Sequence, residues 1–136
     1  MVGGLMDRHY SQTEVTLRVN VYNKLGGYYT MYYFVAIFKD NETEIQIVSE
    51  ESIIDDKRIT IPNENYVNAL AEEIIELSHQ NQLYHNDIKR IGLCINDYTL
   101  VGYDTMDALQ KDLASTFGFE AIIDNNYEHL LAALIK

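Results

Sequence analysis

The second half of the chain repeats a unit in which an apolar strand precedes an amphipathic helix. The run RIGLCIND, residues 90–97, has a continuous apolar centre, Ile91–Ile95, which is typical of a strand inside a sheet. Thr105 is a good N-cap for the next helix, which Gly118 ends. The unit then repeats as the strand Glu120–Asp124 and the helix Tyr127–Lys136. Two such units predict an α/β fold with neighbouring parallel strands.

The first half of the chain predicts an antiparallel meander. Residues 14–22 alternate between apolar and polar, as a half-buried strand does. Residues 28–40 are aromatic and β-branched enough for a strand covered on both faces, and Glu44–Val48 is the third strand. Short polar turns between these strands favour antiparallel neighbours. Residues 49–62 are interpreted as an irregular connection that can include an extended piece at Ile59–Ile61.

A helix is expected between the two halves. It starts after Asn63 or Asn65, both suitable N-caps, and its apolar residues recur at helical spacing to about Gln80. The element order is therefore β-β-β-α-β-α-β-α. That order is the one of an RNase H-like or actin-like lobe, in which a three-stranded antiparallel meander is extended by parallel strands. A ferredoxin-like arrangement is the second choice.

Composition limits the functions open to the chain. The 136 residues, 47% of them hydrophobic, are expected to form one domain over residues 1–136, with residues 1–13 flexible. The net charge of −11 disfavours direct binding of nucleic acid. The longest apolar run, residues 28–38, is shorter than the roughly 20 residues of a membrane helix, and the start of the chain is not a signal peptide. The cytoplasm is the expected compartment.

Polar residues follow both strands of the repeated unit. Asn96 and Asp97 end the first, and Asp124, Asn125 and Asn126 end the second. Such residues lie at the carboxyl edge of a sheet, where α/β folds bind ligands. The alternative for the second group is an N-cap cluster for the last helix, whose first turn also contains a glutamate.

The stretch DIKRIGLCINDYTLVGYDTMDALQKDLASTFGFEAIIDNNYEHLLAALIK resembles the N-terminal lobe of the ROK family, the sugar kinases and sugar-responsive repressors of the actin-like ATPase superfamily. The family has a strand reading roughly G-I-G-V-P-G, a helix, and a strand ending in N-D-A. Asn96 and Asp97 stand in the place of its P-G. The resemblance implies a sugar or sugar phosphate as ligand, with Asn125 on the family's sugar-binding Asn and Asn126 on the Asp that is the general base of kinases. The first half of the chain agrees only in element order.

Departures from the family pattern argue against catalysis. Family kinases have a D-x-G-G-T phosphate turn between their first two strands, whereas NVYNKLGGYYT has Gly26 and Gly27 without the Asp, as a hairpin turn also would. An amide at Asn126 cannot accept a proton, and losing a general base costs roughly 10²–10⁴ in rate. The sequence also has no counterpart of the family's second lobe, and any link to DNA would come from another segment or a partner.

We therefore expect a non-catalytic ROK-like lobe of a sugar-responsive transcriptional regulator, without a cofactor. The alternative is the truncated N-terminal lobe of a ROK sugar kinase, in which a shift of one residue would place Asp124 at the base position. A third interpretation is a small α/β interaction module unrelated to the family.

Adjacent tyrosines predict a contact surface with a second copy or a partner protein, because aromatic rings on both faces of a strand exceed what a small core hides. They are Tyr28, Tyr29, Tyr32 and Tyr33. Packing in the core and in a hairpin is the alternative. Neither metal binding nor nucleophilic catalysis is expected: the four histidines lack metal-site spacing, and burial should raise the pKa of the Cys94 thiol.

Overall fold

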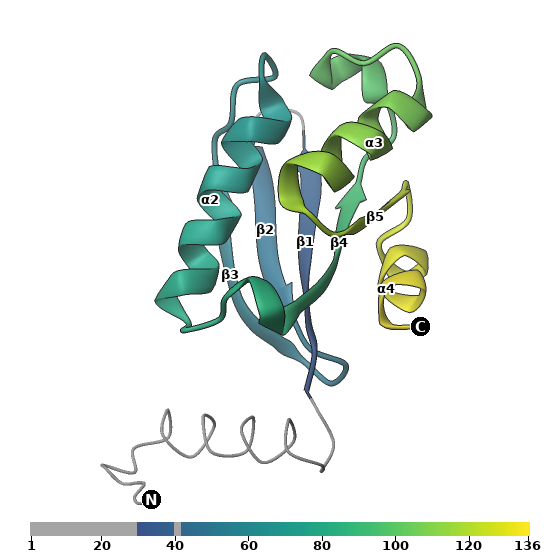
Figure 1. Cartoon of the computed structure of the whole chain (residues 1–136). Coiled ribbons are helices and arrows are strands. Elements are labelled where there is room, and N and C mark those ends of the chain that lie inside the picture. Colours follow the sequence, from purple (N-terminus) through teal and green to yellow (C-terminus); the bar gives the residue numbers. More distant parts are fainter. Residues whose placement is uncertain (1–29, 40–41) are drawn as a thin grey trace, which may run out of the picture. The chain divides into compact units, whose positions relative to one another are not determined.

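A computed structural model describes residues 30–39 and 42–136 of the chain, and Met31–Lys136 form one compact unit. Five strands and three helices make up the described part (Figure 1). The strands are β1 Tyr32–Lys39, β2 Glu42–Val48, β3 Ile53–Ile59, β4 Ile88–Cys94 and β5 Glu120–Asp124. The helices are α2 Tyr66–Gln80, α3 Met106–Phe117 and α4 Tyr127–Ile135, with short 3-10 turns η1 His85–Asp87 and η2 Tyr98–Val101. The α/β prediction is confirmed.

The strands form a single mixed sheet in the order β3-β2-β1-β4-β5. The first three strands pair antiparallel, whereas β4 pairs parallel with β1 and β5 pairs parallel with β4. The carboxyl ends of β1, β4 and β5 therefore lie at one edge of the sheet. The last two strands are the two that the strand–helix repeat predicts.

The segments that form the meander differ from those expected. The strand expected at residues 14–22 lies outside the described residues, and β3 comes from the stretch interpreted as an irregular connection, so that interpretation was wrong. The physical reason is that β3 is an edge strand exposed along most of its length. Its centre is four charged residues in a row, so it lacks the alternation that burial of one face imposes.

Helices lie on both faces of the sheet. Helices α2 and α3 pack on one face and α4 on the other, which gives three layers (Figure 1). Strand β1 is buried on both sides, because Phe34 and Ala36 belong to the core under α2 and α3 while Val35 belongs to the core under α4. This confirms the prediction that its segment is covered on both faces.

The tyrosines of β1 are core residues. Tyr32 is 7% exposed and packs on the side of α2 and α3, and Tyr33 is 1% exposed and packs on the side of α4. Neither offers a contact surface, which corrects that expectation in favour of core packing, because each face of β1 is covered by a helix. Tyr28 and Tyr29 lie outside the described residues.

The helix ends are set by local hydrogen bonds. Thr105 Oγ1 accepts from Ala108 N at 3.0 Å, and Gly118 has φ +80°, so both predicted ends of α3 are confirmed. Asn65 precedes α2 as predicted but does not cap it, because its backbone is left-handed and its side chain accepts from Asn68 Nδ2 at 2.7 Å. Within residues 30–39 and 42–136, no helix has the length and apolar character needed to cross a membrane.

Candidate functional site

Strands β4 and β5 end side by side. Cys94 and Asp124 are paired in register, and Ile95 N donates to the Asp124 carbonyl at 3.0 Å, which extends the pairing by one residue. The two residues after β4, Asn96 and Asp97, thus emerge beside Asp124 and the residues that follow it. The structure brings the predicted ligand residues together at the carboxyl edge of the sheet, where parallel strands leave a binding position.

Two of these side chains hold the turn into α4. Asp124 Oδ1 accepts from Asn126 N at 3.0 Å, and Asn126 Oδ1 accepts from His129 N at 2.9 Å. Asn126 is the N-cap of α4, and Glu128 lies in the first turn, where its negative charge is favourable. The N-cap alternative therefore describes these atoms correctly. It leaves Asp124 Oδ2 and Asn126 Nδ2 for other contacts.

The side chains of Asn125 and Asn96 hold neither a turn nor a helix end. Both side chains are exposed, and neither makes a hydrogen bond within the part of the chain that the structure describes. Each amide offers two N–H donors and a carbonyl acceptor. The site therefore presents hydrogen-bonding groups that local structure does not use.

Asp97 is a capping residue of η2. Its Oδ1 accepts from Thr99 Oγ1 at 2.6 Å and from Thr99 N at 3.0 Å. These hydrogen bonds hold the pKa of the Asp97 carboxyl below its ordinary value. Asp97 is consequently charged at neutral pH, an acceptor of hydrogen bonds and a weak base.

Cys94 lies at the end of β4, half-buried. Burial, and secondarily the nearby charge of Asp124, raise the pKa of its thiol. The expected rise is confirmed. A thiol that stays protonated is a poor nucleophile.

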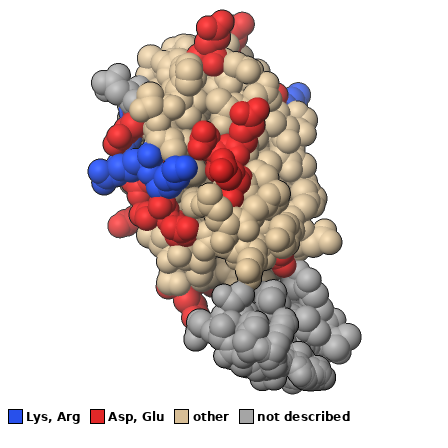
Figure 2. Space-filling model, turned by 90° about the vertical axis from the view of Figure 1, so that its left-hand side faces the viewer, with Lys and Arg blue, Asp and Glu red and all other residues tan. Residues whose placement is uncertain are grey.

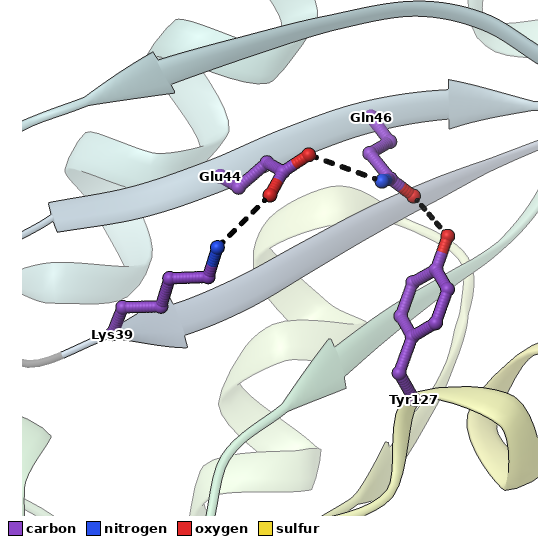
Figure 3. A network of polar contacts seen from close by, with 4 residues as sticks. All are labelled: Lys39, Glu44, Gln46 and Tyr127. Carbon is purple, nitrogen blue, oxygen red and sulfur yellow. Dashed lines mark hydrogen bonds and ion pairs between the residues drawn. The ribbon is translucent and has the colours of Figure 1, made fainter.

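A polar network that the sequence did not predict lies on the α4 side of the sheet, next to these residues (Figure 3). Tyr127 Oη donates to Gln46 Oε1 at 2.7 Å, and Gln46 Nε2 donates to Glu44 Oε2 at 3.3 Å. Lys39 Nζ donates to Glu44 Oε1 at 3.2 Å. The chain of contacts thus joins β1 and β2 to the first residue of α4.

The network fixes the start of α4. Gln46 is only 3% exposed, and its amide is satisfied on both sides, as a buried polar group requires. Although burial disfavours the charged form of Glu44, the hydrogen bonds from Lys39 and Gln46 hold the pKa of Glu44 below its ordinary value. Burial raises the pKa of Tyr127, so its hydroxyl keeps the proton that it donates. Tyr127 directly follows the cap residue, and its bond to β2 therefore stabilises the position of the Asp124–Asn126 turn.

The connection between the first two described strands differs from the one considered in the sequence. Asp40 and Asn41 join β1 to β2, whereas Gly26 and Gly27 precede β1 and lie outside the described residues. The β1–β2 connection contains no glycine. A phosphate turn in which glycines let backbone amides approach the ligand is thus missing from this connection.

A small cavity lies at the opposite end of the sheet. It has a volume of about 80 Å³ and is lined by Phe34, Ile75, Ser78, His79, Tyr84, His85, Phe117 and Phe119. None of the predicted ligand residues contributes to it. Among residues 30–39 and 42–136 there is no group of three or more His, Cys, Asp or Glu side chains placed to hold a metal ion.

Comparison of the sequence with models of known protein families, and with curated proteins, finds no match. The assignment of function therefore rests on the site itself. Its chemistry is that of hydrogen bonding by two exposed amides, a capping amide and two carboxylates. Such a set binds hydroxyl groups, and none of its members is a nucleophile with an activating base.

Proposed function

We propose that this chain is a non-catalytic ROK-like lobe of a sugar-responsive transcriptional regulator, which acts by binding a sugar or sugar phosphate and by associating with protein. The observation that carries the proposal is the gathering of Asn96, Asp97 and residues 124–126 at one edge of the sheet. Ligands of α/β folds bind at this edge. The proposed localisation is the cytoplasm.

The strand arrangement supports the family part of the proposal. An antiparallel meander β1-β2-β3 is extended on the β1 side by the parallel strands β4 and β5. We propose that this is an RNase H-like, actin-like lobe, whose ligand would lie over the carboxyl ends of β4 and β5.

The site chemistry supports binding of a polyol. A sugar hydroxyl both donates and accepts, so it matches an amide that does the same, and carboxylates accept from it as well. Asn125 is the side chain best placed for this role, because it is exposed and its amide has no hydrogen-bond partner among the described residues. Asp124 and Asn126 hold the turn on either side of it.

The same residues give no support to phosphoryl transfer. The position that resembles the kinase base is an amide, Asn126, and its oxygen caps α4. One oxygen of Asp124, the residue that the truncated-kinase alternative needs as base, accepts from Asn126 N. No observation on the described residues favours the truncated-kinase alternative. Formation of a sugar phosphate from ATP by this chain would support it.

The proposal is tested by thermal shift with hexoses, N-acetylhexosamines and their phosphates. A ligand at tenfold its Kd contributes about 1.4 kcal/mol, which raises the Tm of a domain of this size by several degrees. The expected result is a shift for the parent protein that Asn125→Ala abolishes. The matched control is Asn86→Ala in η1, which directly precedes the amino end of β4. This variant should keep the thermal shift. If no sugar shifts the parent, or if Asn125→Ala shifts as the parent does, the proposed site is wrong.

A further inference from the structure

Strand β3 lies at one edge of the sheet and exposes apolar residues to solvent. Among the described strands it pairs only with β2, and most of its residues are exposed. Its first two residues, Ile53 and Ile54, are 50% and 41% exposed. An exposed edge offers unpaired N–H and C=O groups to another strand, so natural proteins cover such an edge or protect it with charge.

The charges of β3 are divided between the two faces of the sheet. On the face under α2, Asp55 Oδ2 accepts from Asn81 Nδ2 at 2.9 Å, and Lys57 Nζ lies 3.8 Å from Glu73 Oε1. Both partners belong to α2 or directly follow it. This face of the strand therefore carries one acid and one base, each with a partner in its own chain.

The opposite face carries the second acid and the second base. Asp56 is paired in register with Gln46, and Arg58 with Glu44, both on the side of the sheet that α4 covers elsewhere. Asp56 and Arg58 are exposed, and neither side chain forms an ion pair within 30–39 and 42–136. The charge of Arg58 does act on Glu44, because it helps to lower the pKa of that carboxyl. An acid and a base two residues apart on one face can meet their opposites in a second, antiparallel copy of the same strand.

We propose that β3 pairs antiparallel with β3 of a second copy of this chain, about a twofold axis at Lys57, so that two sheets join edge to edge. A register shift separates Ile53 from the rest of the strand, so the regular part is Asp55–Ile59, which is centred on that axis. Within one chain Asp56 N donates to Asp55 Oδ1 at 2.8 Å, and pairing with the second copy replaces this bond. Asp56 of each copy then lies directly opposite Arg58 of the other. The contact is isologous and gives a closed dimer.

The charges near the axis are compatible with this pairing. The two Lys57 side chains face each other, but the Nζ of each lies 3.8 Å from Glu73 Oε1 of its own chain. Figure 2 shows this side of the molecule, on which basic side chains gather together among acidic ones. Lysine on an edge strand usually opposes pairing, because it would be buried against apolar or like-charged groups. Here each Lys57 keeps the carboxylate of Glu73 beside it.

The expected dimer is weak. A single pair of strands covers less surface than the roughly 1,600 Å² of a standard stable interface, so association should depend on concentration. Sedimentation of the parent protein over a concentration range should show a reversible monomer–dimer equilibrium.

Charge exchange tests the pairing. Asp56→Arg or Arg58→Asp alone places like charges opposite each other twice, and each should weaken dimerisation about tenfold to a hundredfold. The double variant Asp56→Arg/Arg58→Asp restores both pairs and should dimerise as the parent does. Asp104→Arg, an exposed residue before α3 with the same change of charge, is the control and should have no effect. Circular dichroism verifies that each variant is folded.

A cysteine at the axis tests the register. Directly opposed residues of antiparallel strands have Cα atoms about 4.5–5.5 Å apart, within the range that a disulfide spans. Lys57→Cys should therefore form a disulfide-linked dimer on mild oxidation, more than the parent with Cys94 alone or Lys111→Cys on α3. A parent that is monomeric at every concentration overturns the proposal. So does a folded double variant that fails to dimerise, or Lys57→Cys cross-linking no more than Lys111→Cys.

Discussion

At the scale of single residues, neighbouring asparagines at the end of β5 have different tasks. Asn126 caps α4 through its side-chain oxygen, while the Asn125 side chain is exposed and makes no hydrogen bond with the described residues. A residue that stabilises the fold and a residue available for a ligand thus stand side by side. The two tasks can be separated by measuring stability and binding on the same variants.

We predict that Asn126→Ala lowers the free energy of unfolding by about 1 kcal/mol, because the cap of α4 is lost. Asn125→Ala should change it by less than about 0.5 kcal/mol, as surface substitutions usually do. Asn126→Asp keeps an acceptor oxygen and should be close to the parent. Urea unfolding measures all three. Equal destabilisation by the two alanine variants would show that Asn125 also holds the turn.

A buried tyrosine predicts alkaline sensitivity. Tyr66 is 1% exposed, its hydroxyl lies 2.6 Å from Thr43 Oγ1, and burial raises its pKa to about 12. Its pKa in the unfolded chain is about 10. The unfolded state therefore loses the proton first, so the stability that Tyr66 contributes is complete below about pH 10 and is lost as the pH rises from 10 towards 12.

The free energy of unfolding of the parent, measured by urea between about pH 9 and 12, should thus fall more steeply than that of Tyr66→Phe. The variant itself should be less stable by about 1–3 kcal/mol at neutral pH, because Thr43 loses its buried partner. Parallel pH profiles for the two proteins would contradict the assignment. Tyr103, whose pKa burial also raises to about 12, contributes equally to both profiles.

The position of the candidate site could be predicted from the sequence, whereas the contacts that hold the site in place could not. Polar residues directly after two apolar strands mark the carboxyl edge of a sheet whatever the details of the fold. The contact of Tyr127 with Gln46 joins residues 81 positions apart, and no local pattern indicates it. Gln46 stands between Ile45 and Ile47, where alternation predicts a polar residue on an exposed face, so the sequence does not indicate its burial.

At the scale of elements, α4 depends on its close fit to β4. A Cβ added at Gly92 would lie 2.7 Å from Leu134 Cδ1 and 3.0 Å from Leu130 Cδ1. Both leucines are fully buried. Glycine at this position therefore lets the helix approach the sheet.

We predict that Gly92→Ala destabilises the protein by about 1–3 kcal/mol through overpacking. Shortening the facing side chain in Gly92→Ala/Leu134→Val should recover part of this loss, although Leu134→Val alone is destabilising. Thermal unfolding of the four proteins forms a double-mutant cycle. Additive effects would mean that residues 92 and 134 do not press on each other.

Arg90 stabilises the last turn of α4. Its Nε donates to Glu120 Oε1 at 2.8 Å and its Nη1 donates to the Leu134 carbonyl at 2.6 Å. The second bond satisfies a carbonyl that the helix end leaves without a partner. Arg90→Ala should therefore speed hydrogen exchange of amides in the last turn of α4. Lys111→Ala, which removes only an exposed i,i+4 ion pair, should leave exchange there unchanged, and equal exchange in parent and Arg90→Ala would contradict this function.

Buried elements were predicted well and the exposed strand was missed. The bounds of β5 and the start of α4 agree with the sequence, because apolar runs and capping residues act locally. Strand β3 forms through its pairing with β2, and its Asp-Asp-Lys-Arg centre reflects exposure at an edge. Intrinsic β-propensity predicts such a strand poorly, because pairing with the neighbouring strand determines its conformation.

At the scale of the whole molecule, the features with possible function are separated in space. The polar cluster lies at the carboxyl edge, the small cavity at the other end of the sheet, and the β3 edge on the side away from β5. A ligand at the carboxyl edge and a second copy at β3 can thus be bound together. Strand β2 pairs with β3 and also contacts Tyr127 of α4 through Gln46, so it lies between the two proposed contacts.

A ¹H–¹⁵N NMR titration with the sugar that gives the largest thermal shift would locate the bound ligand on the chain. We predict that the perturbed backbone amides are those of residues 95–98 and 124–127, with saturation at one site, and that Asn125→Ala removes the perturbation. Perturbation centred on the cavity lined by Tyr84 and His85, or no saturable change with any sugar, would show that the proposed site is wrong.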